Sequence, residues 1–200
     1  MAEPLSSTAG RRIDRRVFFS AAAAALGGVV IWHYRRPDLV EARATAPGPP
    51  KVVKIVEFSD AGVRQGVVRV PKVVKTDAEW RKQLGDGAFD ITRKGDTEIA
   101  FTGKYWNLHD NGIYRCICCD TALYSSKTKF NSGTGWPSFW APIAKENIEQ
   151  LADSSFGMDR TAISCRWCDA HLGHVFNDGP RPTGLRYCMN SAALRFIKIA

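Results

Sequence analysis

The pattern of apolar and polar positions predicts short strands first, then short helices, then a longer body. β-Branched residues dominate Val52–Phe58 and Val67–Val74, on either side of the turn-forming residues Ser59–Gly62. Such runs favour strands, and Pro71 confines the second run to a sheet edge or a break, because proline cannot donate to a ladder. We therefore expect a hairpin or two short strands in a strand-rich lead-in, residues 51–75.

Two short helices are expected next. Thr76 and Glu79 have the spacing of a capping box, in which each side chain bonds the backbone of the other residue. The helix that begins there runs through Trp80 and is expected to end at Gly85, since glycine favours helix ends. A second short helix is expected around Phe89–Arg93.

Beyond Gly95, glycine, proline, asparagine and aspartate recur every few residues, and the apolar runs become short. This texture favours a compact, mainly antiparallel β body with long turns. We assign residues 76–200 to this domain, helices included. Its short apolar runs are Ile99–Phe101, Ile163–Cys165, Leu172–Phe176 and Leu194–Ile199.

The N-terminal segment is apolar and preceded by arginines. Arg15 and Arg16 follow a second arginine pair and lead into an uncharged run, Val17–Tyr34. This arrangement resembles a twin-arginine export signal. Eighteen residues of helix measure about 27 Å, near the lower limit for spanning a bilayer. A signal cleaved after Ala44–Ala46 and a retained anchor both remain open, although Pro47 disfavours cleavage there.

We therefore expect residues 1–50 to form an export signal or membrane anchor followed by a linker. The protein is expected to be exported, either periplasmic or anchored with its body facing the periplasm. The charge distribution agrees, because residues 1–54 carry nine Lys/Arg against four Asp/Glu, whereas the remainder carries 19 against 16. So mildly basic a body disfavours nucleic acid as a partner. The chain also shows no phosphate-loop or dinucleotide glycine signature.

Five of the six cysteines fall into two clusters, each with a Cys-x-x-Cys turn. Two such turns are the commonest way to hold one structural zinc ion in a closed tetrahedral site. Disulfides are the alternative in an oxidising compartment. A bridge within Cys-x-x-Cys closes a very small loop and gains little, but a bridge between the two clusters remains open. Cys118 is surplus and is interpreted as a buried bystander. The expected metal ligands are Cys116, Cys119, Cys165 and Cys168.

Cys188 stands apart from both clusters and is the candidate nucleophile. A cysteine reacts as thiolate, and the cationic Arg186, two residues away on the same face of an extended strand, is expected to lower its pKa. His171 or His174 would supply a proton, and Trp136 an aromatic wall for a methyl group on sulfur. Each of these residues alone would have an ordinary structural role, so only their combination points to catalysis.

Four stretches now combine: Lys129–Phe139, the two Cys-x-x-Cys turns, His171–Phe176 and Gly184–Ser191. Together they closely resemble the peptide-methionine (R)-S-oxide reductases, over about residues 70–200. The resemblance implies a compact domain of two antiparallel sheets with short N-terminal helices and, in a zinc-bearing subset, a four-cysteine site.

The resemblance also implies a mechanism. Cys188 attacks the sulfoxide sulfur of an oxidised methionine, most often one in a protein, and is left as sulfenic acid. The two histidines assist protonation, and Phe176 joins Trp136 in substrate binding. Asn190 and Asp178 match family positions around the site, where they are expected to orient water or the histidine rings.

One departure from the family concerns the reductant. Some members carry a resolving cysteine where this chain has Thr134. We therefore expect an external thiol or a thioredoxin-like protein to reduce the sulfenic acid directly.

Two other functions remain open at this point. The first is a non-catalytic, zinc-stabilised protein-binding module, which would use the same four ligands. The second is a disulfide oxidoreductase that uses Cys-x-x-Cys as a redox pair, although no βαβ context for it is recognisable.

Overall fold

A computed structural model describes residues 48–154, 157 and 159–199. The chain divides into two units, residues 1–44 and 45–200, and the description concerns the second. Almost all of the predicted signal or anchor therefore lies outside the described residues. Within them, no helix has the length and apolar character needed to cross a membrane. The predicted boundaries at residues 50 and 75 stay predictions.

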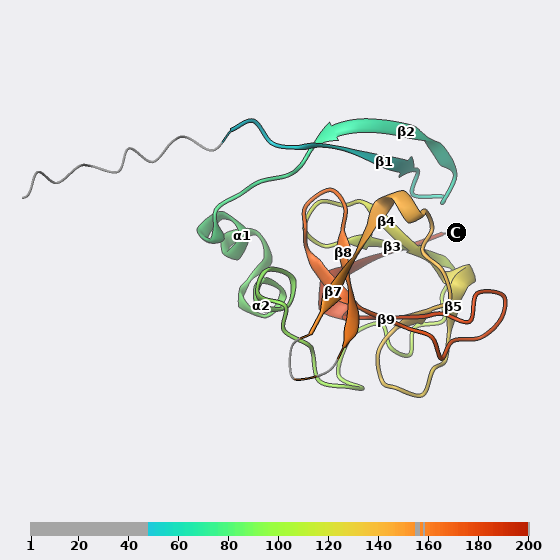
Figure 1. Cartoon of the computed structure of the whole chain (residues 1–200). Helices are drawn as coiled ribbons and strands as arrows, with labels where there is room; N and C mark the ends of the chain where they lie inside the picture. The colour runs from blue at the N-terminus through green and yellow to red at the C-terminus, as the bar shows by residue number, and fades with distance from the viewer. Residues whose placement is uncertain (1–47, 155–156, 158, 200) are drawn as a thin grey trace, which may run out of the picture. The chain divides into compact units, whose positions relative to one another are not determined.

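The described residues are mainly β, as Figure 1 shows, and two short α-helices precede most of the strands. The helices are α1 (Asp77–Leu84) and α2 (Asp86–Lys94). The strands are β1 (Val52–Phe58), β2 (Arg64–Pro71), β3 (Gly112–Cys116), β4 (Ala122–Ser125), β5 (Lys129–Phe130), β6 (Ser138–Phe139), β7 (Ile148–Asp153), β8 (Arg160–Cys165), β9 (His171–Phe176), β10 (Arg186–Met189) and β11 (Leu194–Lys198).

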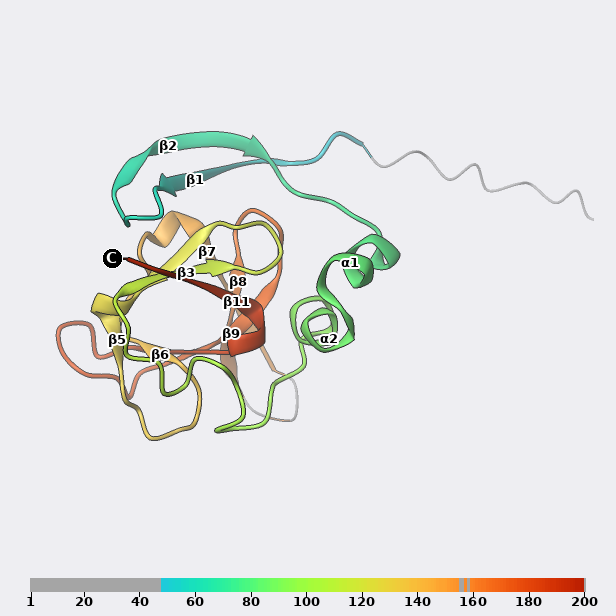
Figure 2. The same cartoon turned by 180° about the vertical axis from the view of Figure 1, so that it is seen from behind.

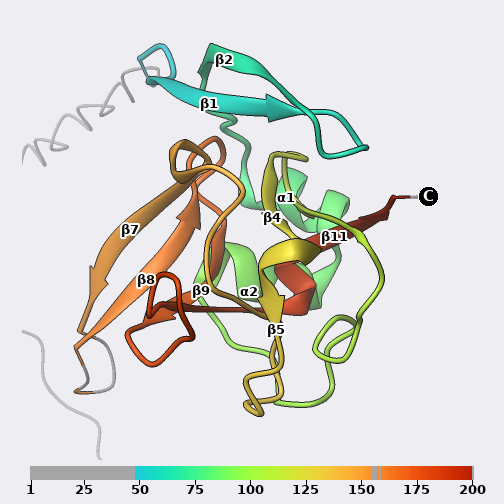
Figure 3. The ribbon, with the colours of Figure 1, turned by 90° about the vertical axis from the view of Figure 1, so that its right-hand side faces the viewer.

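The strands form three antiparallel sheets. The largest has six strands in the order β5-β6-β10-β9-β8-β7, and a second has three in the order β11-β3-β4. The third is the hairpin of β1 and β2, which lies along one side of the body in Figures 1 and 2. Figure 3 shows β7 and β8 as a long hairpin beside the other strands. The expected class, a mainly β domain of antiparallel sheets with short N-terminal helices, is confirmed. Two sheets were expected, and the described residues add the lead-in hairpin as a third.

The lead-in hairpin forms where the sequence predicts it, with a shift in its second strand. That strand begins at Arg64 and ends at Pro71, three residues earlier at each end than the predicted run. Pro71 pairs with Val52 at the last position of the ladder, where a missing N–H costs least. The carbonyl of Pro71 accepts a bond of 2.9 Å from the indole of Trp167, which ties the strand end to the body.

The helices also form as predicted. The amide of Glu79 donates to the Thr76 hydroxyl at 3.3 Å, while the Thr76 amide donates to the Glu79 carboxylate at 2.7 Å. Gly85 then separates α1 from α2. Trp80 of α1 and Phe89 of α2 are both fully buried in the hydrophobic core. Each helix therefore packs on the body through one large aromatic side chain.

The run Ile99–Phe101 forms no strand, contrary to the texture of the sequence around it. Its residues lie in a turn, where Phe101 has a positive φ of 66°. The amide of Phe101 donates to the carbonyl of Gly135 at 2.8 Å, so the chain is held by a distant loop instead of a ladder. Ile99 is 76% exposed, and its apolar character therefore does not reflect burial.

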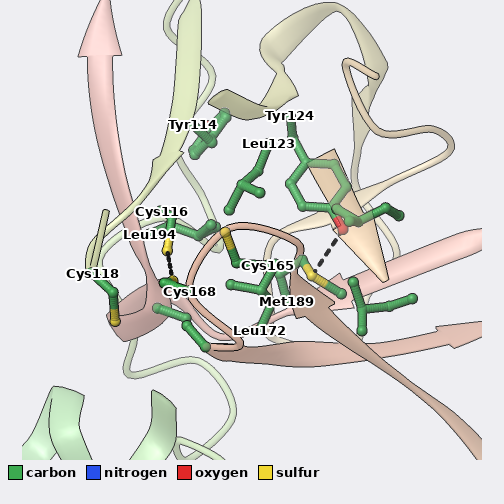
Figure 4. Close-up of a cluster of buried hydrophobic side chains, with 14 of the residues drawn as sticks. Tyr114, Cys116, Cys118, Leu123, Tyr124, Cys165, Cys168, Leu172, Met189 and Leu194 are labelled. Carbon is green, nitrogen blue, oxygen red and sulfur yellow. Dashed lines mark hydrogen bonds between the residues drawn. The ribbon is translucent and has the colours of Figure 1, made fainter. Parts of the chain in front are cut away.

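An aromatic cluster forms the centre of the core and joins the two larger sheets. Tyr124 of β4 stacks on Phe139 of β6, with ring centroids 4.4 Å apart and an interplanar angle of 17°. The Tyr124 hydroxyl donates to the Met189 sulfur at 3.1 Å, as the dashed line in Figure 4 shows. Since Met189 follows Cys188 in β10, this packing fixes the strand that carries the candidate nucleophile.

Candidate active site and metal centre

Cys188 lies in the middle of β10, between two neighbouring strands. It pairs in register with His174 of β9 on one side and with Ser138 of β6 on the other. Side chains of directly opposed residues point to the same face and lie about 4.5–5.5 Å apart at Cβ. The pairing therefore places the Cys188 sulfur beside the imidazole of His174.

A β-bulge brings the two histidines together. Residues three apart in a regular strand point to opposite faces of the sheet. Between β8 and β9, however, the register shifts at Ile163/Ser164, so that one residue of β9 has no partner of its own. As a result, the rings of His171 and His174 meet edge to face, with centroids 5.3 Å apart.

Gly173, between these histidines, permits the close approach of β9 to β10. Its φ is +152°, and a β-carbon placed there would lie 2.2 Å from the carbonyl oxygen of Cys188. Any side chain at this position would push apart the two strands that carry the nucleophile and the imidazole. The glycine is therefore a requirement of the site geometry.

The sulfur faces a pocket of about 140 Å³. Both predicted substrate-binding residues, Trp136 and Phe176, line it. Thr97 and Arg160, which the sequence did not indicate, also line it. So does Asn190, which was expected to orient water or the histidine rings. The full lining comprises Thr97, Trp136, Arg160, Gly173, His174, Phe176, Cys188, Met189 and Asn190.

Trp136 is held in this wall by Glu98, a residue that sequence reasoning missed. The indole N–H donates to the Glu98 carbonyl at 3.0 Å. The Glu98 carboxylate accepts from the amides of Ser191 and Ala192 at 2.5 and 3.0 Å. The two carboxylate bonds join residues 93 and 94 positions apart in the sequence, so no local pattern signals them.

Asn190 belongs to the same arrangement. Its side-chain oxygen accepts from the Glu98 amide at 3.0 Å, and its side-chain nitrogen donates to the Leu172 carbonyl at 3.3 Å. Asn190 is thus a positioning residue for the segment that holds Trp136. Both of these side-chain bonds go to backbone groups, and among the described residues neither involves a histidine ring.

Asp178 is bound to Arg186 in place of a histidine. The guanidinium donates through Nε and Nη2 to the two carboxylate oxygens, each at 2.8 Å. Arg186 also lies over the ring of Phe176, 4.3 Å from its centroid. The bidentate contact lowers the pKa of Asp178, so its carboxyl group is ionised. The negative carboxylate partly neutralises the positive charge of Arg186.

The environment of Cys188 differs from the expectation of a lowered pKa. Burial raises the pKa of the Cys188 thiol, and this effect outweighs the opposing hydrogen bond from Thr134 and the charge of Arg186. The Thr134 hydroxyl lies 3.9 Å from the sulfur. Because Arg186 is already paired with Asp178, its cation stabilises the thiolate less than a free guanidinium would. The resting group is therefore a neutral thiol near pH 7.

The two histidines have different environments. Burial, with a contribution from His174, lowers the pKa of His171 to about 4, so its ring is neutral near pH 7. Nε2 of His171 is buried and has no hydrogen-bond partner among the described residues. His174 instead lies 2.7 Å from the carboxylate of Asp153, which also pairs with Arg160 at 2.9 Å. Sequence reasoning missed both Asp153 and Arg160.

The other predicted cluster forms a separate centre. The sulfurs of Cys116, Cys119, Cys165 and Cys168 lie within 4.8 Å of one another. The closest pairs are 3.5 and 3.6 Å apart. Four sulfurs about 2.3 Å from a tetrahedral zinc ion would be about 3.8 Å apart, so the cluster could hold a metal of this kind. The sulfurs fit that site without rearrangement of the backbone.

The two Cys-x-x-Cys turns have the same backbone pattern. After each turn an aspartate adopts a positive φ, 66° at Asp120 and 56° at Asp169, and its amide donates to the first cysteine of the turn at 2.9 Å. Aspartate is among the few non-glycine residues that tolerate this conformation. One turn joins β3 to β4 and the other joins β8 to β9, so a bound metal would link the two larger sheets.

Cys118 is buried within the first turn but takes no part in the four-sulfur cluster. Its carbonyl accepts from the side chain of Gln83 in α1 at 2.8 Å. These contacts fix Cys118 between the metal turn and a helix.

Fold and site together define a small antiparallel β domain with a pocketed thiol, an adjacent histidine and a separate four-cysteine centre. The SelR domain matches residues 84–198. Among similar proteins, the peptide methionine sulfoxide reductase MsrB of Herminiimonas arsenicoxydans is 57% identical over 125 residues, which are 62% of this chain and 91% of the relative. The MsrB of Hahella chejuensis is 56% identical over 125 residues, or 62% and 90% of the two chains. A chloroplastic peptide methionine sulfoxide reductase B1 of Oryza sativa is 58% identical over 124 residues, covering 62% and 58%.

The chain therefore belongs to the SelR domain family, the peptide-methionine (R)-S-oxide reductases. This confirms the family and the enzyme class that the sequence indicates. A non-catalytic zinc module is correspondingly not favoured.

Proposed function

We propose that this chain reduces methionine-(R)-sulfoxide in oxidised proteins through direct attack by Cys188. The observation that carries the proposal is the shared pocket of the Cys188 sulfur, the His174 ring and the Trp136 indole. In the reaction, a bond forms between the Cys188 sulfur and the sulfoxide sulfur while the sulfoxide oxygen is protonated. The substrate S–O bond and the new S–S bond then break as the oxygen passes to Cys188. The thiol is thereby oxidised to sulfenic acid, which keeps the proton on its oxygen, and the sulfoxide is reduced to the thioether.

The resting protonation state supports a definite source for the proton. Since burial raises the pKa of Cys188, the thiol carries its proton into the complex, where it can be passed toward the developing oxyanion. His174 is the carrier we propose, because it faces Cys188 across the strands and is held by Asp153. His171, neutral and outside the pocket lining, supports the ring of His174. Trp136 and Phe176 enclose the methyl group.

Reduction of the sulfenic acid is assigned to an external thiol or a thioredoxin-like protein. The Thr134 hydroxyl lies 3.9 Å from the Cys188 sulfur, where a cysteine side chain could form a disulfide with Cys188. Threonine has no sulfur and cannot form that bond. Cys118 is buried in the metal turn and bonded to α1. The oxidised enzyme is therefore expected to keep its sulfenic acid until a reductant arrives.

Mass spectrometry after a single turnover tests this proposal. One equivalent of methionine-(R)-sulfoxide, without reductant, is expected to add one oxygen to Cys188, trappable by dimedone, while the S epimer adds none. Cys188→Ser is expected to lose all turnover, and Cys118→Ser to retain it. Turnover by Cys188→Ser, or a Cys118–Cys188 disulfide after one turnover, would contradict the proposed chemistry.

We further propose that the metal in the four-cysteine centre is a single structural zinc ion. Thiolate ligands in two tight turns, with S···S separations near 3.6 Å, support zinc and leave no open coordination position. Elemental analysis of the purified protein is expected to find one zinc per chain. Cys116→Ser should lose it, whereas Cys118→Ser, changed two residues away, should keep it.

For the N-terminal segment we propose export by the twin-arginine route, followed by release or anchoring at the membrane. The arginine pairs and the uncharged run after them support this assignment. Residues 1–50 fused to a folded reporter are expected to carry it across the membrane. The double substitution Arg15→Lys/Arg16→Lys should retain the reporter inside, and export of that variant would contradict the route.

A further inference from the structure

We propose that Phe101 forms a second substrate subsite, which binds an apolar side chain one or two residues from the oxidised methionine. This inference rests on the proposed function, since it assigns a preference to the same site. It commits to one occupant, an aliphatic or aromatic side chain of the polypeptide being repaired.

Phe101 is an exposed aromatic residue directly beside the catalytic loop. Its side chain is 55% exposed, yet its ring lies so close to Gly135 that a β-carbon at that glycine would be 2.7 Å from it. The two flanking residues of Gly135 both belong to the reactive site: Thr134 lies 3.9 Å from the Cys188 sulfur, and Trp136 lines the pocket. Phe101 therefore packs against the loop that supplies Trp136 to the pocket wall.

The chain holds this ring in a fixed place. Phe101 has a φ of 66°, a conformation that bulky side chains rarely adopt and that persists only where the surroundings impose it. Its amide bond to the Gly135 carbonyl and the two bonds from Thr102 to the Ile99 carbonyl impose it here. The ring also meets Trp106 edge to face at 5.3 Å. An exposed aromatic side chain constrained in this way is a preformed contact surface.

The size of the pocket explains why a substrate would reach Phe101. At about 140 Å³, the pocket is well below the roughly 300–1,000 Å³ of sites that enclose whole small molecules. It holds one side chain, so the backbone of a protein substrate must lie outside, across the rim. An extended backbone advances about 3.3 Å per residue, which brings neighbouring side chains over the adjacent loop surface.

The exposed turn around Phe101 is apolar, so it favours an apolar side chain of the substrate. Ile99, 76% exposed, precedes Phe101 in the same turn and makes the turn apolar at both ends. An aliphatic or aromatic neighbour of the oxidised methionine would bury apolar area there. An amide or charged neighbour would lose water without gaining a hydrogen bond from a hydrocarbon surface.

Two matched peptides test the proposal with the full chain. They differ only in the residues flanking methionine-(R)-sulfoxide, leucine in one and the nearly isosteric asparagine in the other. The unchanged protein is expected to show a kcat/KM about tenfold higher for the leucine peptide, which corresponds to about 1.4 kcal/mol. In Phe101→Asn, which tolerates positive φ but removes the ring, the preference is expected to disappear while the rate on free methionine-(R)-sulfoxide stays within about twofold.

Two further variants complete the test. Val74→Asn removes an apolar side chain that is 70% exposed and far along the chain from the catalytic loop, and it is expected to keep the tenfold preference. Phe101→Gly, which suits the backbone conformation better still, should behave as Phe101→Asn does. The inference is overturned if the unchanged protein shows no preference, if the Phe101 variants keep it, or if they lose activity equally on all substrates. Failure of the proposed function would appear separately, as turnover by Cys188→Ser.

Discussion

At the scale of single residues, two opposing effects set the pKa of the Cys188 thiol, and only one of them can be recognised from the sequence. Arg186, two positions away, is visible in the sequence and favours the thiolate. Burial and the clamp of Asp178 on that arginine appear only in the folded chain, and burial has the larger effect on the pKa of Cys188. The thiol is thus largely protonated in the resting protein near pH 7.

This balance predicts how alkylation of Cys188 depends on pH. The thiolate is the reactive form, and a raised pKa means that less of it exists at pH 7. The rate of iodoacetamide labelling should therefore still be rising above pH 8.5, the midpoint of an ordinary thiol. Arg186→Gln removes an influence that lowers the pKa, so its curve should move to higher pH, whereas Arg64→Gln, in β2, should not move it. Peptide mass spectrometry of Cys188 measures the rate, and a plateau below pH 8 would refute the expected direction.

Asp153 is predicted to act on catalysis through His174. Its carboxylate, 2.7 Å from Nε2, fixes the ring orientation and stabilises the imidazolium that forms when the ring holds a proton. Asp153→Asn keeps the size of the side chain and should lower kcat about 10- to 100-fold with little change in KM. A purely structural role would lower the free energy of unfolding and leave kcat of the folded enzyme unchanged. The informative measurements are therefore urea unfolding and kcat, and kcat should fall in Asp153→Asn and not in Asp159→Asn, an exposed carboxylate close along the chain.

At the scale of elements, the decisive feature is the contact between β9 and β10. The bulge in β9 places both histidines on one side, and Gly173 lets the strands approach where Cys188 faces His174. The catalytic arrangement is therefore a property of two paired strands and their register.

Gly173→Ala tests this reading of the strand pair. The added methyl group would meet the Cys188 carbonyl at 2.2 Å, a backbone atom that cannot move alone. We expect a loss of stability of about 1–3 kcal/mol and a larger proportional loss of activity, because the strands must separate at the reactive residues. Gly87→Ala in α2, where an added β-carbon would meet nothing within 4 Å beyond the helix's own backbone, should leave both unchanged or raise stability slightly. Urea unfolding and kcat/KM report the two effects, and a fully active Gly173→Ala would contradict the argument.

The same elements show how far the sequence alone can lead. The capping box at Thr76, the first hairpin strand and the two metal turns are local patterns, and each forms where it is predicted. The bulge in β9 and the turn at Phe101 have no such signature, because register and long-range hydrogen bonds determine them. For this reason the apolar run Ile99–Phe101 suggested a strand that is absent.

The candidate site divides in the same way. Its chemically conspicuous members, a lone cysteine with an arginine, two histidines and a tryptophan, could be selected from residue type and spacing. Glu98, Asp153 and Arg160 could not, because ordinary charged residues acquire a role only through partners that folding supplies. Glu98, for example, bonds Ser191 and Ala192 at the far end of the chain.

At the scale of the whole molecule, separate connections hold the described layers together. The four-cysteine centre joins a turn of each larger sheet, and the aromatic cluster fills the space between them. The lead-in hairpin is attached by Asn147, which is fully buried. The side-chain oxygen of Asn147 accepts from the Val56 amide of β1 at 2.7 Å. Its side-chain nitrogen donates to the carbonyls of Val56 and Ala122, each at 2.8 Å.

Asn147 should therefore be among the most sensitive positions outside the active site. Asn147→Ala would leave the buried backbone groups of Val56 without their partner, at a cost of about 2–4 kcal/mol. Asn131→Ala removes an exposed asparagine with a single local bond to Gly133 and should cost at most about 0.5 kcal/mol. Urea unfolding gives the free energies, and hydrogen exchange at Val56 locates the change. Asn147 and Val56 are not among the residues that line the Cys188 pocket, so folded Asn147→Ala should keep its kcat. A loss of kcat in the folded variant would show that the lead-in hairpin also shapes the active site.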